Sequence, residues 1–154
     1  MKLAFVGGGT MAEAMVERII AGGVATPDQV NVVDVSLARR QLLQERYRVA
    51  THEAASDCVC GADVVVLAVK PQDLEKVAPQ VGALEGGQLL LSILAGTKLE
   101  RLVTHFRHPL IVRAMPNTPA QIGLGMTVWT ATSDVSGEYV VKARSILSVL
   151  GDEL

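Results

Sequence analysis

The chain has 154 residues, of which 49% are hydrophobic and 19% are charged, and its formal net charge is −2. This length suits one domain with a buried core, and the composition excludes a disordered chain. A chain without a basic excess and with only 3% aromatic residues lacks the usual signature of nucleic-acid or acidic-membrane binding. No apolar run reaches the length that spans a bilayer. We therefore expect one domain over residues 1–154, with no nucleic acid and no membrane as partner.

Short apolar runs alternate with helical patterns from the start of the chain. The first run meets glycines at Gly7 and predicts a buried strand, and Gly22 and Gly23 are expected to end the helix that follows. Ser36 is expected to cap the second helix. The elements expected in this part are a strand over 2–6, a helix over 10–21, a strand over 29–33, a helix over 37–47 and a strand over 48–50.

The alternation continues through the rest of the chain. Six apolar residues in a row precede Lys70, and a continuous run of this kind predicts a strand covered on both faces. Strands that alternate with helices predict a Rossmann-type α/β fold, with a doubly wound, mostly parallel sheet and right-handed crossovers. The elements expected here are strands over 63–69, 88–93, 110–113 and 126–130, and helices over 72–81, 98–106 and 135–150.

The turn after the first strand carries a dinucleotide-binding pattern. Gly7, Gly9 and Ala12 match G-x-G-x-x-A. In this pattern the first glycine permits a tight turn, the second lets the backbone approach a pyrophosphate, and the small third residue lets helix and strand pack closely. The amides and dipole at the N-terminus of the next helix favour phosphate groups. We therefore expect this turn to bind the pyrophosphate of NAD or NADP.

Asp34 ends the second expected strand, 25 residues after Gly9, near the spacing of a carboxylate that binds ribose hydroxyls. Its charge favours NAD, because it would repel a 2′-phosphate. Ser36, Arg39 and Arg40 follow closely, and they either receive that phosphate or form a solvated first helical turn. The choice between NAD and NADP stays open.

Three later strand ends are expected to meet at the same edge of the sheet as the glycine turn. Lys70 is either a surface lysine or a contact to the cofactor or an anionic substrate, and Pro71 stiffens the loop beside it. Small residues after the strand over 88–93 admit a flat ring close to the backbone. The stretch 113–119 places Asn117 and Thr118 between two prolines, which suits the orientation of a carboxamide or carboxylate.

Four segments in this order closely resemble pyrroline-5-carboxylate reductase: VGGGTMA at 6–12, LAVKPQ at 67–72, SILAG at 92–96 and RAMPNTPA at 113–120. The resemblance covers essentially the whole chain. It implies an NAD(P)-dependent oxidoreductase acting on a CH–NH bond in proline biosynthesis. In that reaction a hydride passes from the nicotinamide to the C=N carbon of 1-pyrroline-5-carboxylate and gives L-proline.

The glycine pattern, the spacing of Asp34 and the resemblance together define the expected site. The expected cofactor-binding residues are Val6, Gly7, Gly8, Gly9, Thr10, Met11, Asp34, Ser36, Arg39, Ala68, Val69, Lys70, Pro71, Ile93, Leu94 and Ala95. The residues expected near the nicotinamide or the substrate are Met115, Pro116, Asn117 and Thr118.

Three residues depart from the family pattern. Thr10 stands where the family often has Asn or Gln, and Ala55 falls about where an Asn often meets the adenosine ribose. Asp34 stands where many members carry a neutral residue, which puts their frequent NADPH preference in doubt for this chain.

The largest departure is length, because family members continue into a helical domain that dimerises and completes the substrate pocket. We expect that domain to be absent here, so that the chain binds cofactor and turns over slowly or not at all, and we expect the full-length form to be a homo-oligomer. Two alternatives remain: a non-catalytic dinucleotide-binding module, and another Rossmann reductase of the hydroxyacid dehydrogenase type. The RAMPNTPA segment argues against the latter.

No residue of the chain is identified as catalytic, since no Ser/His/Asp or Cys/His set is present. His52, at an expected helix start, and His105 and His108, at an expected helix end, are interpreted as surface or capping residues. Cys58 and Cys60 are too few for a structural zinc site, so we expect reduced structural thiols and no metal. Reduced thiols and the lack of a signal peptide predict a cytoplasmic protein.

Overall fold

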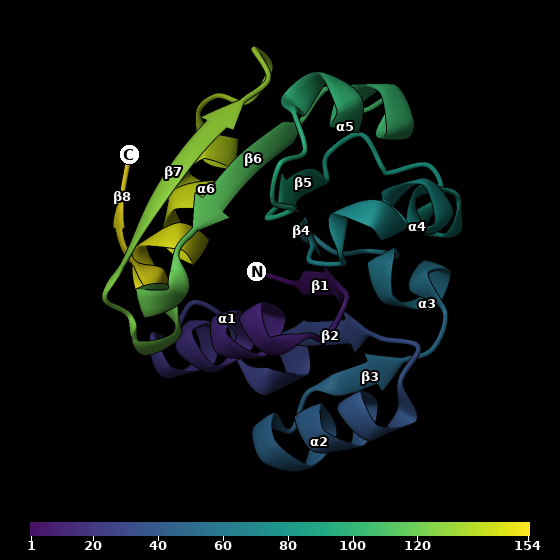
Figure 1. Cartoon of the computed structure of the whole chain (residues 1–154), viewed down its shortest axis with the longest axis vertical. Coiled ribbons are helices and arrows are strands. Elements are labelled where there is room, and N and C mark those ends of the chain that lie inside the picture. Colours follow the sequence, from purple (N-terminus) through teal and green to yellow (C-terminus); the bar gives the residue numbers. More distant parts are fainter.

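Eight strands form one sheet in the computed structural model, which describes all of residues 1–154 (Figure 1). Their order is β3-β2-β1-β4-β5-β6-β7-β8, and every neighbouring pair is parallel except β6 and β7. The mostly parallel, doubly wound sheet expected from the sequence is thereby confirmed. The strands are β1 (Leu3–Val6), β2 (Val30–Val33), β3 (Ala50–His52), β4 (Val64–Leu67), β5 (Leu89–Ser92), β6 (Ile111–Pro116), β7 (Gly125–Ala131) and β8 (Gly151–Glu153).

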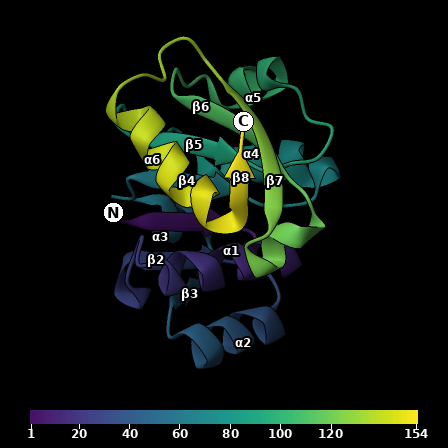
Figure 2. The same ribbon diagram turned by 90° about the vertical axis from the view of Figure 1, so that its left-hand side faces the viewer.

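Helices cover both faces of the sheet, as Figures 1 and 2 show. Residues of α1, α2 and α6 pack into the core on one face, and residues of α3, α4 and α5 into the core on the other. The helices are α1 (Thr10–Ala21), α2 (Leu37–Tyr47), α3 (Ala55–Val59), α4 (Leu74–Val81), α5 (Leu99–Phe106) and α6 (Glu138–Leu147). Short 3₁₀ turns are η1 (Pro27–Gln29), η2 (Pro71–Asp73), η3 (Thr118–Ile122) and η4 (Ser148–Leu150). None of these helices is long and apolar enough to cross a membrane.

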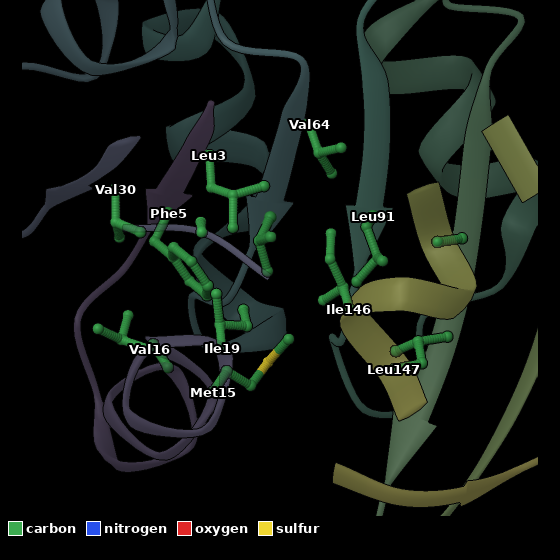
Figure 3. Packing of buried hydrophobic residues seen from close by; sticks show 14 of the residues in the cluster. Leu3, Phe5, Met15, Val16, Ile19, Val30, Val64, Leu91, Ile146 and Leu147 are labelled. Carbon is green, nitrogen blue, oxygen red and sulfur yellow. The ribbon is translucent and has the colours of Figure 1, made fainter. Parts of the chain in front are cut away.

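The central strands supply side chains to both cores in strict alternation. In β1, Leu3 and Phe5 enter the core shared with α1 and α6, and Ala4 and Val6 enter the other one. Figure 3 shows the Phe5 ring beside Ile19 of α1. Full burial of each large apolar side chain contributes about 1.5–3 kcal/mol. This alternation explains why β1, β4 and β5 read as continuous apolar runs.

Most expected elements of the first two-thirds of the chain lie within two residues of the observed ones. The helix α1 ends at Ala21 with Gly22 as its cap, as expected. The Ser36 side chain accepts a hydrogen bond of 3.3 Å from the backbone amide of Arg39, which confirms it as the cap of α2.

The middle of the chain departs from expectation in the position of one strand, in one unexpected helix and in two histidines. The strand expected over 48–50 is β3, two residues later, because Arg48 adopts a left-handed conformation (φ 60°) that ends α2. His52 therefore lies in β3, and its Nε2 is 2.8 Å from Oδ1 of Asn31 on β2. Helix α3 was not expected, because it is only five residues long. His108 is buried, with Nε2 2.6 Å from the carbonyl oxygen of Gln88, so it is no surface histidine.

The C-terminal part also differs from expectation. Strand β6 runs to Pro116, so half of the expected RAMPNTP loop is strand paired with β7. The helix expected over 135–150 is shorter, and Gly151 begins an eighth strand. Gly151 has φ 131°, and a Cβ there would collide with the carbonyl oxygen of Gly125 on β7. The lack of a side chain at this position lets β8 approach β7.

Both cysteines are free. Cys58 is buried beneath β1 and Cys60 is exposed. Desolvation raises the pKa of the Cys58 thiol to about 12, which leaves it protonated and unreactive. Cys58 is thus a packing residue, as expected.

A partly buried carboxylate anchors β8 to its neighbours. Glu153 accepts a hydrogen bond of 2.5 Å from the indole nitrogen of Trp129 on β7 and one of 2.6 Å from Nε of Arg144 on α6. These hydrogen bonds, that from Trp129 foremost, lower the pKa of Glu153 below its usual value of 4.5. The carboxylate therefore ties the last strand to both a strand and a helix.

Acid is expected to release this anchor. Because the folded pKa lies below 4.5, ionised Glu153 stabilises the folded chain above that pH, and the contribution is lost as pH falls through the folded pKa. Trp129 is the single tryptophan, so its fluorescence in a titration from about pH 7 to about pH 3 reports the loss. In Glu153→Gln the acid-dependent fluorescence step is expected to disappear. An unchanged titration in that variant would contradict the anchoring role.

Candidate functional site

A cleft of about 510 Å³ opens at the carboxyl ends of β1, β2 and β4. The strand order reverses between β1 and β4, since the chain first builds outward to β2 and β3 and then returns to place β4 on the other side of β1. Ligands of open α/β sheets bind at this switch point. The cleft is lined by Val6, Gly7, Gly9, Val33, Asp34, Val35, Glu53, Ala55, Ala68, Val69, Lys70, Asp73, Lys76, Val77 and Gln80.

Gly7 makes the sharp turn out of β1. Its φ of 104° is unfavourable for residues with a side chain, and a Cβ there would lie 2.7 Å from the carbonyl oxygen of Ala68. Its amide donates a 2.9 Å hydrogen bond to the carbonyl of Val33 at the end of β2. Glycine is therefore required at this position for packing, whether or not a ligand is bound.

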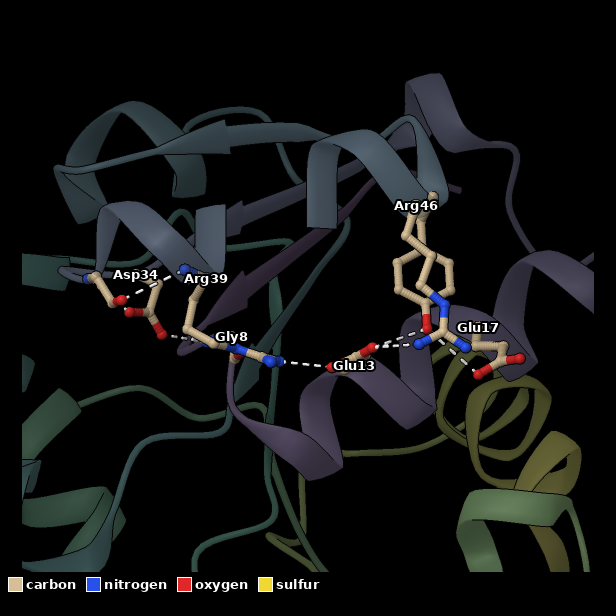
Figure 4. Close-up of polar contacts among 8 residues, drawn as sticks. Gly8, Glu13, Glu17, Asp34, Arg39 and Arg46 are labelled. Atoms are coloured by element: carbon tan, nitrogen blue, oxygen red, sulfur yellow. Dashed lines mark hydrogen bonds and ion pairs between the residues drawn. The ribbon is translucent and has the colours of Figure 1, made fainter. Parts of the chain in front are cut away.

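Gly8 is held from both sides. Its amide donates to Oδ2 of Asp34 at 2.9 Å, and its carbonyl accepts from Nε of Arg39 at 2.7 Å (Figure 4). The other carboxylate oxygen of Asp34 accepts from the amide of Ser36 at 2.8 Å. A carboxylate has about four acceptor positions, so Asp34 retains capacity for a hydroxyl group in the cleft.

Gly9 and the first turn of α1 form a row of free donors. The amides of Gly9, Thr10, Met11 and Ala12 donate to no protein atom. A Cβ at Gly9 would meet nothing within 4 Å, and Gly9 itself lines the cleft, so the turn has open space beside it. Free amides at the positive end of a helix dipole suit an anion such as a pyrophosphate. The donor set therefore fits a dinucleotide.

A charged network lies behind the turn, away from the cleft. Glu13 of α1 pairs with Arg39 at 2.7 Å and Arg46 at 3.2 Å, and accepts from the hydroxyl of Tyr47 at 3.0 Å. Burial by itself raises the pKa of Glu13, but hydrogen bonds from Arg39 and Tyr47 and the charges of both arginines outweigh it and leave that pKa lowered. Glu13 is therefore ionised, and it orients Arg39.

The opposite wall of the cleft comes from η2 and α4. Asp73, Lys76, Val77 and Gln80 line it at helical spacing. The exposed Lys70 also lines the cleft, just before η2. Sequence reasoning missed these side chains of α4, and also Val33, Val35 and Glu53. The signal was present, because residues three or four apart on the helix after the switch-point strand share the face that looks across the cleft.

The expected site residues separate into two groups. Val6, Gly7, Gly9, Asp34, Ala68, Val69 and Lys70 line the cleft, and Gly8, Thr10, Met11, Ser36, Arg39 and Pro71 lie in the turns and first helical residues around it. The second group lies outside the cleft: Ile93, Leu94 and Ala95 follow β5, and Met115, Pro116, Asn117 and Thr118 run from the end of β6 into η3.

Individual residues of the second group differ in exposure. Leu94 is buried in the core that it shares with residues of α4 and α5, so its side chain cannot contact a ligand at the surface. Met115 is 42% exposed. Asn117 accepts from the amide of Met126 at 2.9 Å through Oδ1, which leaves its amide nitrogen free to donate. No group of three or more His, Cys, Asp or Glu side chains is arranged to hold a metal ion.

Comparisons with known proteins agree with this geometry. A family model described as NADP oxidoreductase coenzyme F420-dependent matches residues 2–96. The chain is 38% identical over 152 residues to a pyrroline-5-carboxylate reductase of Synechocystis sp., covering 99% of this chain and 57% of that relative. The Coxiella burnetii pyrroline-5-carboxylate reductase structure has a TM-score of 0.89 at 30% identity, covering 99% of this chain and 57% of that chain.

A more distant structure shows the same fold. The Plasmodium falciparum pyrroline carboxylate reductase, solved with NADP bound, has a TM-score of 0.87 at 22% identity and covers 100% of this chain and 56% of that chain. The chain thus spans little more than half the length of the relatives it matches.

The two outer glycines of the turn are expected to differ in what they do for folding. Gly7→Ala is expected to lower the free energy of unfolding by about 2–4 kcal/mol, because strain at positive φ adds to the collision with Ala68. Gly9→Ala is expected to stay within about 0.5 kcal/mol of the parent, because its φ of −73° is ordinary and its surroundings are open. Urea unfolding measures both.

Gly61→Ala is the matched control. Gly61 also has a positive φ, 72°, but nothing lies within 4 Å of its added Cβ. A loss of about 1 kcal/mol there isolates backbone strain from collision. Equal losses at Gly7 and Gly9 would contradict the packing role of Gly7.

Proposed function

We propose that residues 1–154 are the dinucleotide-binding part of a pyrroline-5-carboxylate reductase. The chain belongs to the family described as NADP oxidoreductase coenzyme F420-dependent. The observation that carries the proposal is the row of free amides from Gly9 to Ala12 at the switch point of the sheet. The specific reaction rests on the similarity to named pyrroline-5-carboxylate reductases over 99% of the chain.

The bound dinucleotide would supply the hydride that reduces the C=N carbon of 1-pyrroline-5-carboxylate to give L-proline. The chain's own residues would bind and orient it. The amides of the glycine turn would hold the pyrophosphate, and Asp34 would accept from the adenosine ribose. Ala68–Pro71 and Ile93–Ala95 would line the nicotinamide side, and 115–118 would form the floor near the substrate.

Substrate positioning is the main task left to the protein in this reaction. A cyclic imine is readily protonated near neutral pH, so a correctly placed ring needs little further acid catalysis. Asn117 supports such a role, because Oδ1 is engaged by Met126 and the amide nitrogen is left as a directed donor. Met115 and Pro116 beside it would provide an apolar surface for the ring.

Binding and turnover test this proposal separately. The chain is expected to bind NADH or NADPH in a fluorescence titration. Gly9→Ala is expected to weaken binding at least about tenfold while leaving the fold intact, because a Cβ at this cleft-lining position would block the close approach of the backbone to the pyrophosphate. Loss of binding without loss of stability is the result that assigns the turn to the cofactor. Unaltered binding by Gly9→Ala would contradict it.

For turnover, the chain is joined to the segment of the Synechocystis sp. relative that it does not cover, and 1-pyrroline-5-carboxylate is added with reduced cofactor. A fall in the absorbance of the reduced nicotinamide with formation of proline is expected. A joined protein that binds cofactor but consumes no substrate would contradict the reductase and leave a dinucleotide-binding module.

The cofactor itself is proposed to be NADH in preference to NADPH. Two carboxylates, Asp34 and Glu53, line the end of the cleft at β2 and β3, where a 2′-phosphate would be repelled. Arg40 donates to the carbonyls of Asp34 and Val35 and pairs with Glu53 at 3.8 Å. Arg40 is therefore already engaged by the backbone of 34–35 and by Glu53.

Asp34→Asn tests the preference with the smallest change. The amide keeps one oxygen acceptor and removes the negative charge, so NADPH affinity is expected to rise about tenfold relative to NADH. Asp73→Asn, on the opposite wall of the cleft, makes the same change of charge and is expected to alter both affinities equally. An unchanged ratio in Asp34→Asn would show that Asp34 does not select the cofactor.

A further inference from the structure

Arg39 is the one basic side chain that touches the glycine turn. Its Nε donates to the carbonyl of Gly8 at 2.7 Å. Asp34 binds the amide of the same glycine, so a guanidinium and the proposed ribose-binding carboxylate lie on either side of one residue. A positive charge so close to the ribose end of the cleft suits a 2′-phosphate, yet the cleft lining does not include Arg39.

The reason is the partner that Arg39 has on its other side. Its terminal nitrogen pairs with Oε2 of Glu13 at 2.7 Å, behind the turn, as Figure 4 shows. The Glu13 side chain is 16% exposed and that of Arg39 is 29% exposed, so the pair is partly shielded from water and from salt. Charge-assisted hydrogen bonds of this length are about twice as strong as neutral ones.

Glu13 is itself held firmly. Arg46 pairs with its second oxygen at 3.2 Å, and the hydroxyl of Tyr47 donates to that oxygen at 3.0 Å. Both partners come from the last turn of α2, whereas Arg39 comes from the first turn. One carboxylate of α1 thus binds both ends of α2, and it leaves Arg39 little freedom to turn toward the cleft.

We propose that Glu13, which does not line the cleft, is a specificity-determining positioning residue: it holds the Arg39 guanidinium against the glycine turn and thereby withholds it from a 2′-phosphate. The inference rests on the proposed function, since it presumes a dinucleotide in the cleft. With Glu13 ionised, the charge of Arg39 is neutralised where it stands, and Asp34 sets the preference for NADH. Without that carboxylate, Arg39 becomes a free cation beside the ribose.

Glu13→Gln is the test, because glutamine keeps an acceptor for Tyr47 and Arg46 and removes only the charge. The titration measures the affinities of the chain for NADH and NADPH. NADPH affinity is expected to rise about tenfold relative to NADH. Glu17→Gln is the matched control: it removes the same charge one helical turn further along α1, contacts Tyr47 at 3.3 Å and does not touch Arg39. It is expected to leave the ratio unchanged.

Arg39→Gln completes a double-mutant cycle. Alone, it is expected to weaken the binding of NADH and NADPH equally, because it removes the hydrogen bond that holds the Gly8 carbonyl. Combined with Glu13→Gln, it is expected to abolish the gain in NADPH affinity. Thermal unfolding of each variant identifies any that fails to fold, and Glu13→Asp then replaces Glu13→Gln: it keeps the charge but shortens its reach to Arg39, so a partial gain is expected.

The outcomes are distinct. An unchanged ratio of NADPH to NADH affinity in Glu13→Gln overturns the role of Glu13. A change in this ratio in Glu17→Gln as large as that in Glu13→Gln also overturns it. A selective loss of NADPH affinity in the single variant Arg39→Gln also overturns it, because Arg39 would then already bind the 2′-phosphate in the unmodified chain. If the unmodified chain binds neither dinucleotide, the proposed function fails instead.

Discussion

The contact between the backbone of Gly7 and the carbonyl of Ala68 is the constraint on which the site depends. It joins the turn after β1 to the turn after β4, across the point where the strand order reverses. Only a residue without a side chain permits this approach at φ 104°. Because the two turns are this close, the free amides of α1 and the polar side chains of α4 face each other across one cleft.

Charge then divides the neighbourhood of the turn into two sides. Asp34 faces the cleft, whereas Glu13 and its arginine and tyrosine partners lie behind it. Arg39 of α2 contacts the turn and the network behind it: it donates to the carbonyl of Gly8 and pairs with Glu13. The turn is thus set before any ligand binds, and such preorganisation reduces the entropy that binding has to overcome.

The fold and much of the site were predictable because they depend on local patterns. Continuous apolar runs identified β1, β4 and β5, which are buried on both faces. The glycine pattern and Asp34 lie next to these strands, and their spacing placed them at the cleft. The short helix α3 and strand β8 were missed because elements of five residues or fewer carry too weak a local signal. The extent of β6 was missed because this strand ends at a proline, a residue that argues against a strand.

By itself the sequence determined the doubly wound sheet, the glycine turn, and the identity of the carboxylate at the end of β2. Only the tertiary structure decided what the charged residues do. Ser36, Arg39 and Arg40 all follow Asp34 closely in sequence, but the first caps a helix and the second pairs with Glu13, 26 residues away. The third lies against the backbone of 34–35. Side-chain pairing across elements depends on distances that spacing along a chain does not encode.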